Sequence, residues 1–352
     1  MTEAHPGPAP SEAHEDAGWF DRLDAPGRRR LVVLVAFALV AIPLIVAVVA
    51  LHSPRWYPIG DLAQTELRVR DVGTGDSPMI GLVGRLGTLT EPGSHPGPLS
   101  FWLLAPVYRL LGTSAFALIV STVFLHLVAL GLALWIAFRR AGPWLAVGVG
   151  AASVWLARGY GQEVLTTPWN PFLPVTWWLV LLLALWSLLC DDEVMLPIAV
   201  LAGSFCAQTH IPYLGLFGGL IVCTGVPIAV LTWRRRRHRT DEDGGRDDGW
   251  GHVWWWVLGS AVLGGVLWLP PIIQQLTNDP GNLTVIKDSL SNHEEPAVGI
   301  VDGAKVLLQN LDPFALFTHR APRVLNDANS SVVPGLLLLV AWLASVALAW
   351  RR

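Results

Sequence analysis

The sequence predicts an all-α polytopic membrane protein, and three observations support this fold class. Hydrophobic residues make up 53% of the 352 residues and charged residues only 14%, whereas an ordinary soluble domain has roughly 25% charged residues. The apolar residues form runs close to the length of about 20 residues that crosses a bilayer. Clusters of arginine stand directly at the ends of several runs. We therefore expect about eight transmembrane helices and one helix that lies along the outer membrane surface.

The start of the chain differs from the rest. Residues 1–30 are rich in Pro, Ala, Glu and Asp and show no apolar period, which predicts a disordered cytoplasmic tail. Arg28–Arg30 precede the apolar run 31–51, a pattern typical of an uncleaved signal anchor. Residues 31–352 then form one predicted transmembrane domain. Its expected spans are 31–51, 114–138, 143–157, 172–189, 195–211, 213–233, 252–269 and 334–350.

A further apolar run, 98–111, decides the topology because it is short and contains Arg109. If it does not cross the membrane, all the arginine clusters lie on the cytoplasmic side; if it crosses, every cluster after the first moves outside, against the positive-inside rule. We therefore predict an interfacial or re-entrant helix at 98–111. Both termini are then cytoplasmic in a multi-pass protein of the plasma (inner) membrane. Long outer loops are expected at 52–113 and 270–333, and a solvated inner loop at 234–251.

Two acidic residues follow the first predicted span and are candidates for catalysis. Asp61 and Glu66 lie in the first outer loop, on a predicted helix at 61–72. A carboxylate near hydrocarbon is costly unless it is paired or used. Two structural alternatives stay open: Asp61 could cap this helix, and Glu66 could pair on the helix surface with Arg70, four residues on.

Further polar residues occur at the predicted outer ends of helices and are candidates for substrate binding. Each candidate has a structural alternative. Arg85 could be an exposed charge in a loop, and His95 could stabilise a turn. The turn 158–171 could serve only to lead the chain back into the membrane, and residues 208–210 could form hydrogen bonds between helices. We expect 208–210 to line the same cavity as Asp61. The candidates for substrate binding are Arg85, His95, Gln162, Glu163, Asn170, Gln208, His210 and Tyr213.

The sequence excludes several other classes of site. It contains no Walker sequence, heptad repeat, zinc signature or Ser-His-Asp arrangement. The cysteines Cys190, Cys206 and Cys223 lie in or at the ends of apolar runs without metal-type spacing, which predicts buried thiols. No residue is assigned to a metal, and no cofactor is identified; a divalent cation stays open.

Taken together, these residues resemble bacterial membrane glycosyltransferases of the GT-C type, which take sugars from polyprenyl phosphates. The resemblance covers roughly 31–233. It depends on Gly60-Asp61 in the first outer loop, on His95-Pro96-Gly97-Pro98 before a juxtamembrane helix, and on the helix 114–138 that runs inward to a basic pair. It implies a GT-C-like helix arrangement, with Asp61 as the general base. Two positions depart from the family pattern: Leu62 stands where many relatives carry a second acid, and Gly97 where a second proline is commoner.

The expected function is therefore transfer of a sugar from a polyprenyl-phosphate donor to an acceptor hydroxyl on a glycan, lipid or protein, at the outer side of the bilayer. The alternative is a transporter or flippase for a lipid-linked or anionic solute. That reading predicts ionisable residues at mid-membrane, where only His126 is found. A third reading is a non-catalytic scaffold of cell-envelope assembly. No nucleic-acid partner is expected.

Overall fold

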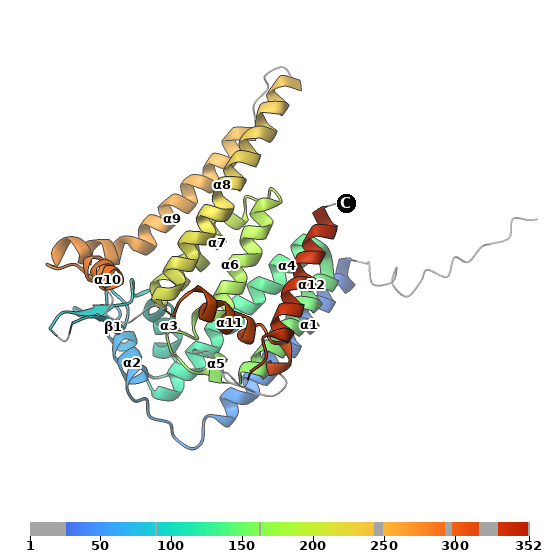
Figure 1. Cartoon of the computed structure of the whole chain (residues 1–352). Coiled ribbons are helices and arrows are strands. Elements are labelled where there is room, and N and C mark those ends of the chain that lie inside the picture. Colours follow the sequence, from blue (N-terminus) through green and yellow to red (C-terminus); the bar gives the residue numbers. More distant parts are fainter. Residues whose placement is uncertain are drawn as a thin grey trace, which may run out of the picture.

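The computed structural model describes residues 26–88, 90–161, 163–242, 249–292, 298–316 and 330–350. The chain is mostly helical, and its long helices form a bundle with shorter elements gathered toward one end (Figure 1). The elements are α1 (Pro26–Ala50), α2 (Asp61–Asp71), β1 (Val83–Gly87), β2 (Pro92–Ser94), α3 (Leu99–Leu110), α4 (Ala115–Tyr160), α5 (Glu163–Thr166), α6 (Pro174–Leu189), α7 (Met195–Thr209), α8 (Ile211–Glu242), α9 (Gly249–Thr277), α10 (Asn282–Ser291), α11 (Ile300–Asn310), the 3₁₀ helix η2 (Pro313–Leu316) and α12 (Val333–Trp350).

The prediction of a helical membrane protein is confirmed at this level. Among the described residues, three helices are long and apolar enough to cross a membrane, namely Gly27–Ala50, Ala115–Gly159 and Val253–Thr277. Several shorter apolar helices accompany them: Leu99–Leu110, Pro174–Leu189, Met195–Thr209, Ile211–Pro227 and Val333–Leu348. Helices thus occupy the residues of every predicted span, whereas the number that cross the bilayer stays a prediction.

The helix α4 consists of two arms that fold back on each other. Its backbone leaves helical geometry at Ala141 and at Gly142, where φ is 77°. A Cβ on Gly150 would lie 3.4 Å from the Leu134 side chain, although a straight helix would separate these residues by about 24 Å at 1.5 Å per residue. The reversal occurs where the sequence predicts a turn between 114–138 and 143–157; its position on the inner side stays a prediction.

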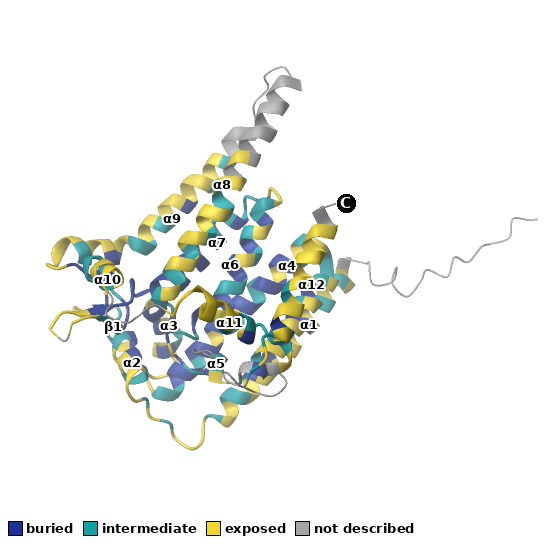
Figure 2. Cartoon of the chain, in the orientation of Figure 1, coloured by how far each residue is buried: buried dark blue, intermediate teal, exposed yellow. Residues whose placement is uncertain are grey.

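The core of the bundle is formed by α3, the first arm of α4, α6 and α7. Figure 2 shows that buried residues concentrate in these helices, while α1, α9 and α12 are largely exposed. The helix α3 belongs to this core, because Phe101, Leu104 and Tyr108 are at most 2% exposed. It is therefore embedded in the protein along one face rather than lying loosely on a membrane surface.

An ion pair joins the α4 hairpin to the turn between α6 and α7. Arg139 donates to both carboxylate oxygens of Asp192, from Nε at 2.7 Å and from Nη2 at 2.9 Å. This bidentate contact lowers the pKa of Asp192, against the opposing effect of burial. The acidic sequence at 190–193 is therefore a partner for the basic pair at the end of the first arm of α4.

The structure corrects several sequence-based expectations. Residues 26–30, predicted to be part of a disordered tail, are helical; the remainder of that tail lies outside the described residues. The inner loop 234–251 was predicted as a linker, but α8 continues to Glu242 and α9 starts at Gly249, because arginine is a good helix former and gives no stop signal. Cys206 is buried as predicted, whereas Cys190 and Cys223 are exposed.

The first outer loop also contains a small antiparallel hairpin of β1 and β2 that the all-α prediction omits. Its strands are short and rich in glycine, so they carry none of the period-2 alternation by which strands are recognised. We call the end of the bundle that holds this hairpin, α2 and α3 the outer end, following the predicted topology. It occupies the lower part of Figure 1.

Candidate functional site

Asp61 is the first residue of α2 and lies exposed at the outer end. The N-cap of this helix is Gly60, and no side chain caps it, so the capping alternative for Asp61 is wrong. Its Oδ2 instead accepts a hydrogen bond of 3.0 Å from Nε1 of Trp169, in the segment between α5 and α6. One oxygen of the Asp61 carboxylate thus accepts from a neutral donor. This contact orients the carboxylate but provides no positive charge to pair with it.

Next to this contact, a buried cluster brings together side chains from three separate loops. Asn170 follows Trp169 directly, and its side-chain amide lies 2.6 Å from Nε2 of His95 and 3.3 Å from Nδ1 of His210. The two imidazole rings are 4.9 Å apart. Asn170 and His95 are buried. The sequence predicted all three residues as candidates, and the structure brings them together.

The hydrogen bonds of His95 fix its tautomer. The Ile211 backbone N–H donates to Nδ1 at 3.1 Å, and a neutral imidazole has one donor and one acceptor nitrogen. Nε2 therefore carries the proton, and the amide atom of Asn170 that faces it is best assigned as the oxygen. Burial, together with the nearby His210, lowers the pKa of His95 to about 4, although the charge of Asp61 acts in the opposite direction. His95 is consequently neutral at pH 7.

Gln208 and Gly97 connect the cluster to the helix bundle. The Gly97 N–H donates to the backbone oxygen of Gln208 at 3.1 Å, and a Cβ on Gly97 would overlap the Gln208 carboxamide, with only 2.6 Å to Cδ. The Gln208 side chain is fully buried and donates to the Leu267 carbonyl. Glycine is therefore required after His95-Pro96, because proline would lose the N–H and any side chain would meet Gln208.

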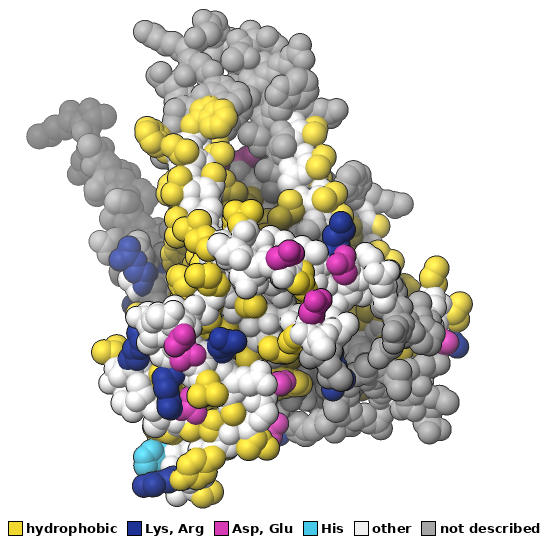
Figure 3. Space-filling view, turned by 90° about the vertical axis from the view of Figure 1, so that its left-hand side faces the viewer, with side chains coloured by type: hydrophobic (Ala, Val, Ile, Leu, Met, Phe, Trp, Pro, Cys, Tyr) yellow, Lys and Arg dark blue, Asp and Glu magenta, His cyan; other side chains and the backbone are white. Residues whose placement is uncertain are grey.

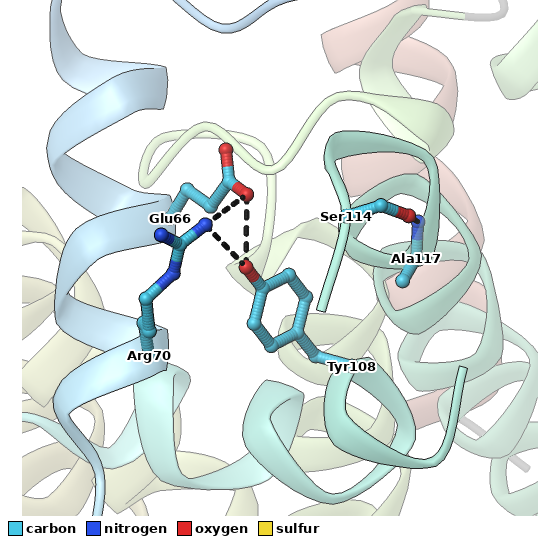
Figure 4. A network of polar contacts seen from close by, with 5 residues as sticks. All are labelled: Glu66, Arg70, Tyr108, Ser114 and Ala117. Carbon is cyan, nitrogen blue, oxygen red and sulfur yellow. Dashed lines mark hydrogen bonds and ion pairs between the residues drawn. The ribbon is translucent and has the colours of Figure 1, made fainter. Parts of the chain in front are cut away.

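Glu66 lies in a different network, which joins α2 to α3 (Figure 4). Its Oε1 accepts from the Tyr108 hydroxyl at 2.8 Å and from Nη2 of Arg70 at 3.1 Å. The same guanidinium donates to the Tyr108 oxygen at 3.2 Å. The expected pair of Glu66 with Arg70 is formed, and the carboxylate is occupied in holding two helices together.

The remaining predicted residues lie around this centre or away from it. Arg85 is on the exposed face of β1, while its neighbour Gly84 faces the His95 ring; Arg85 and His95 therefore lie on different sides of the strand. Glu163 is exposed at the start of α5. The Tyr213 ring packs against Trp178 with centroids 5.3 Å apart. Gln162 lies outside the described residues.

Sequence reasoning missed two residues that matter to this geometry. Trp169 is not among the candidates from the sequence, although its N–H holds Asp61. Tyr108 was hidden within an apolar run, although it joins Glu66 and Arg70. The available signal for Tyr108 was its hydroxyl group, because a buried Tyr hydroxyl needs a hydrogen-bond partner. The same helix also carries Arg109 and Pro106.

The fold and the site define a helical membrane protein with an exposed carboxylate beside a buried histidine and amide cluster at the outer end. Within the described residues, no three His, Cys, Asp or Glu side chains come close enough together to hold a metal ion. Comparison with known proteins finds no matching family model, no similar curated protein and no similar solved structure.

Proposed function

We propose that the protein is a membrane glycosyltransferase that moves a sugar from a polyprenyl-phosphate donor to an acceptor hydroxyl at the outer side of the membrane. The observation that carries the proposal is the position of Asp61: an exposed carboxylate, oriented by Trp169, beside a buried neutral cluster where three loops meet. This arrangement leaves one group able to take a proton, on a rigid support.

The chemistry assigns one step to Asp61. The acceptor oxygen attacks the anomeric carbon of the donor sugar and forms the new glycosidic bond. The bond between that carbon and the phosphate oxygen breaks, and the lipid phosphate leaves with the electron pair. The proton of the acceptor hydroxyl passes to the Asp61 carboxylate. Because the leaving phosphate is already stable, one well-placed base is the main catalytic requirement on the protein.

Two apolar grooves between helices support a lipid-linked donor. The larger one, of about 690 Å³, lies between α1 and the second arm of α4, and all its lining residues are apolar except Arg158. A smaller groove of about 260 Å³ lies between α4 and α6. A hydrocarbon chain fits such a lining, and a guanidinium beside it suits a phosphate.

The test is a transfer assay with radiolabelled polyprenyl-phosphate sugars and purified protein. Asp61→Asn keeps the size of the side chain and removes the base, so we expect a loss of about 10²–10⁴ in rate. The matched control is Asp76→Asn, which changes another exposed carboxylate of the same outer loop and is expected to leave the rate unchanged. Turnover of Asp61→Asn at the wild-type rate would remove Asp61 from the mechanism, and failure of the wild type to transfer any of the sugars would count against the function.

A further inference from the structure

A polar cavity at the outer end is separate from the two apolar grooves between the helices. It has a volume of about 850 Å³ and lies between the β1–β2 hairpin and α10, within the range of about 300–1,000 Å³ that is usual for small-molecule sites. Its polar lining includes Arg85 and Glu91 from the first outer loop and Asp288, Ser289 and Asn292 from the second. The cavity therefore exists only because two distant outer loops come together.

Specific contacts hold its two walls in place. The Gly87 N–H donates to Oγ of Ser289 at 2.6 Å. The buried side chain of Asn282 accepts from the Ser94 N–H at 2.8 Å and donates to the Ser94 carbonyl at 3.1 Å. Val285 also lies so close to Gly87 that a Cβ there would come within 2.9 Å of its methyl group. A side chain at Gly87 would separate the walls, so the cavity is fixed by close packing.

The chemistry of the lining narrows the class of ligand. Among the described residues, the cavity presents one guanidinium and two carboxylates, so the charge of this lining opposes a phosphate or another anion. A purely apolar ligand would leave these charged groups desolvated without partners. Figure 3 views this side of the molecule and shows acidic and basic side chains interspersed among apolar ones rather than separated by sign.

A neutral ligand with many hydroxyl groups satisfies such a lining. The carboxylates of Glu91 and Asp288 accept hydrogen bonds from hydroxyls, and Arg85 donates to them. Leu86, Val285 and Leu290 offer apolar surface on which the C–H faces of sugar rings can pack. We infer that this cavity binds a neutral oligosaccharide.

The position of the cavity indicates the role of such a ligand in the proposed reaction. Arg85 lines the cavity, and a Cβ on the adjacent Gly84 would lie 3.7 Å from the His95 ring. The cavity and the His95 cluster are thus separated by a single strand. The bound oligosaccharide is accordingly the acceptor chain of the reaction, a step that rests on the proposed transferase function, whereas the binding itself does not.

Binding is tested by native mass spectrometry of the detergent-solubilised full chain with neutral tetrasaccharides of glucose, mannose, galactose and arabinose. We expect at least one tetrasaccharide to bind the wild type. The affinity of the double variant Arg85→Gln/Asp288→Asn for that tetrasaccharide should be at least tenfold lower. The matched control is Lys287→Gln, because Lys287 neighbours Asp288 on α10 but does not line the cavity. This control is expected to bind like the wild type.

The outcomes separate the two proposals. Asp61→Asn should bind the tetrasaccharide normally even though it has lost transfer. Binding that survives Arg85→Gln/Asp288→Asn in a folded protein, judged by an unchanged melting temperature, would overturn the site. Absence of binding by the wild type to all four tetrasaccharides would overturn the ligand class. Neither result would bear on Asp61, which the transfer assay tests separately.

Discussion

At the scale of single residues, His95 shows how burial sets the chemical state of a candidate site residue. Its two ring nitrogens are both used, by the Ile211 N–H and by Asn170, and its side chain is buried. It therefore supports the segment that holds Asp61, and its predicted contact with substrate stays a prediction. Asn170 is likewise buried and lies within hydrogen-bond distance of both imidazole rings.

The lowered pKa of His95 predicts a pH-dependent contribution to stability. In the unfolded chain the imidazole titrates near 6.5, and in the folded protein near 4. Between these values the unfolded state binds more protons, so folding stability is fully present above about pH 6.5 and falls as the pH drops toward 4. A difference of this size corresponds to about 3 kcal/mol.

Thermal unfolding in detergent between pH 7.5 and 4 measures this effect. The wild type should lose stability over that interval more steeply than His95→Gln, which has no titrating ring at this position. The control is His52→Gln, at an exposed histidine, and its pH profile should follow the wild type. Parallel profiles for the wild type and His95→Gln would show that His95 is not buried in its neutral form.

Gly97 gives a second prediction at this scale. Gly97→Ala should lower the free energy of unfolding by about 1–3 kcal/mol, the usual cost of inserting a methyl group into a packed site. The overlap is with the Gln208 side chain, so the same substitution made in Gln208→Ala should cost much less. Denaturant unfolding of the four proteins forms a double-mutant cycle. Equal costs in both backgrounds would place the conflict elsewhere.

At the scale of elements, α3 and α4 determine the path of the chain through the helix bundle. The α4 hairpin reverses at Ala141 and Gly142, and the clamp between Arg139 and Asp192 holds this reversal against the α6–α7 turn. Asp192 is buried, whereas Arg139 is partly exposed. The main effect of the ion pair is therefore to provide the buried Asp192 carboxylate with a positively charged partner. The helix α3 packs inside the same bundle, with both of its ends toward the outer surface in the predicted topology.

Cysteine labelling tests the position of α3. In a Cys190→Ser/Cys223→Ser background, Thr88→Cys and Thr113→Cys place exposed thiols before and after this helix. If α3 does not cross the membrane, an impermeant thiol reagent should modify both from outside intact cells. In the otherwise wild-type chain, the exposed Cys190 should react only after the cells are permeabilised. Modification of only one of the two introduced cysteines from outside would mean that α3 crosses.

At the scale of the whole molecule, the outer end is assembled from segments that are far apart in the sequence. The hairpin contacts α10 through Gly87 and Ser289, and the His95 loop contacts the α7–α8 junction through Gly97 and Gln208. Such contacts bring the exposed acid Asp61 and the polar cavity to the same end of the molecule. In the proposed function, Asp61 acts at this end of the molecule.

The transporter alternative would depend on the membrane interior, where the sequence offers His126. The structure places this residue fully buried, with Nδ1 2.8 Å from the Thr176 hydroxyl. That hydrogen bond joins α4 to α6, which is the usual role of a polar group between membrane helices. The proposals for enzyme and transporter therefore use different residues, and loss of function in Asp61→Asn favours the enzyme.

The sequence by itself determined the helical elements of this protein and its membrane class. Apolar runs, prolines and arginine clusters act locally, through hydrophobic length and charge, so helices occupy the residues predicted for the spans, whereas α10 and α11 lie in the segment predicted as the outer loop 270–333. The sequence also identified Asp61, His95, Asn170 and His210 as candidates, because polar residues at helix ends near hydrocarbon are energetically costly unless they are paired or functional.

Only the tertiary structure decided which of these residues meet. The contacts of Asp61 with Trp169 and of His95 with Asn170 join residues that are 108 and 75 positions apart, and nothing in local periodicity specifies such pairs. The same is true of the separation of Arg85 from His95 and of the cavity behind the hairpin, which depends on glycines that let α10 approach. Local patterns fix elements, whereas close packing between distant segments fixes the site.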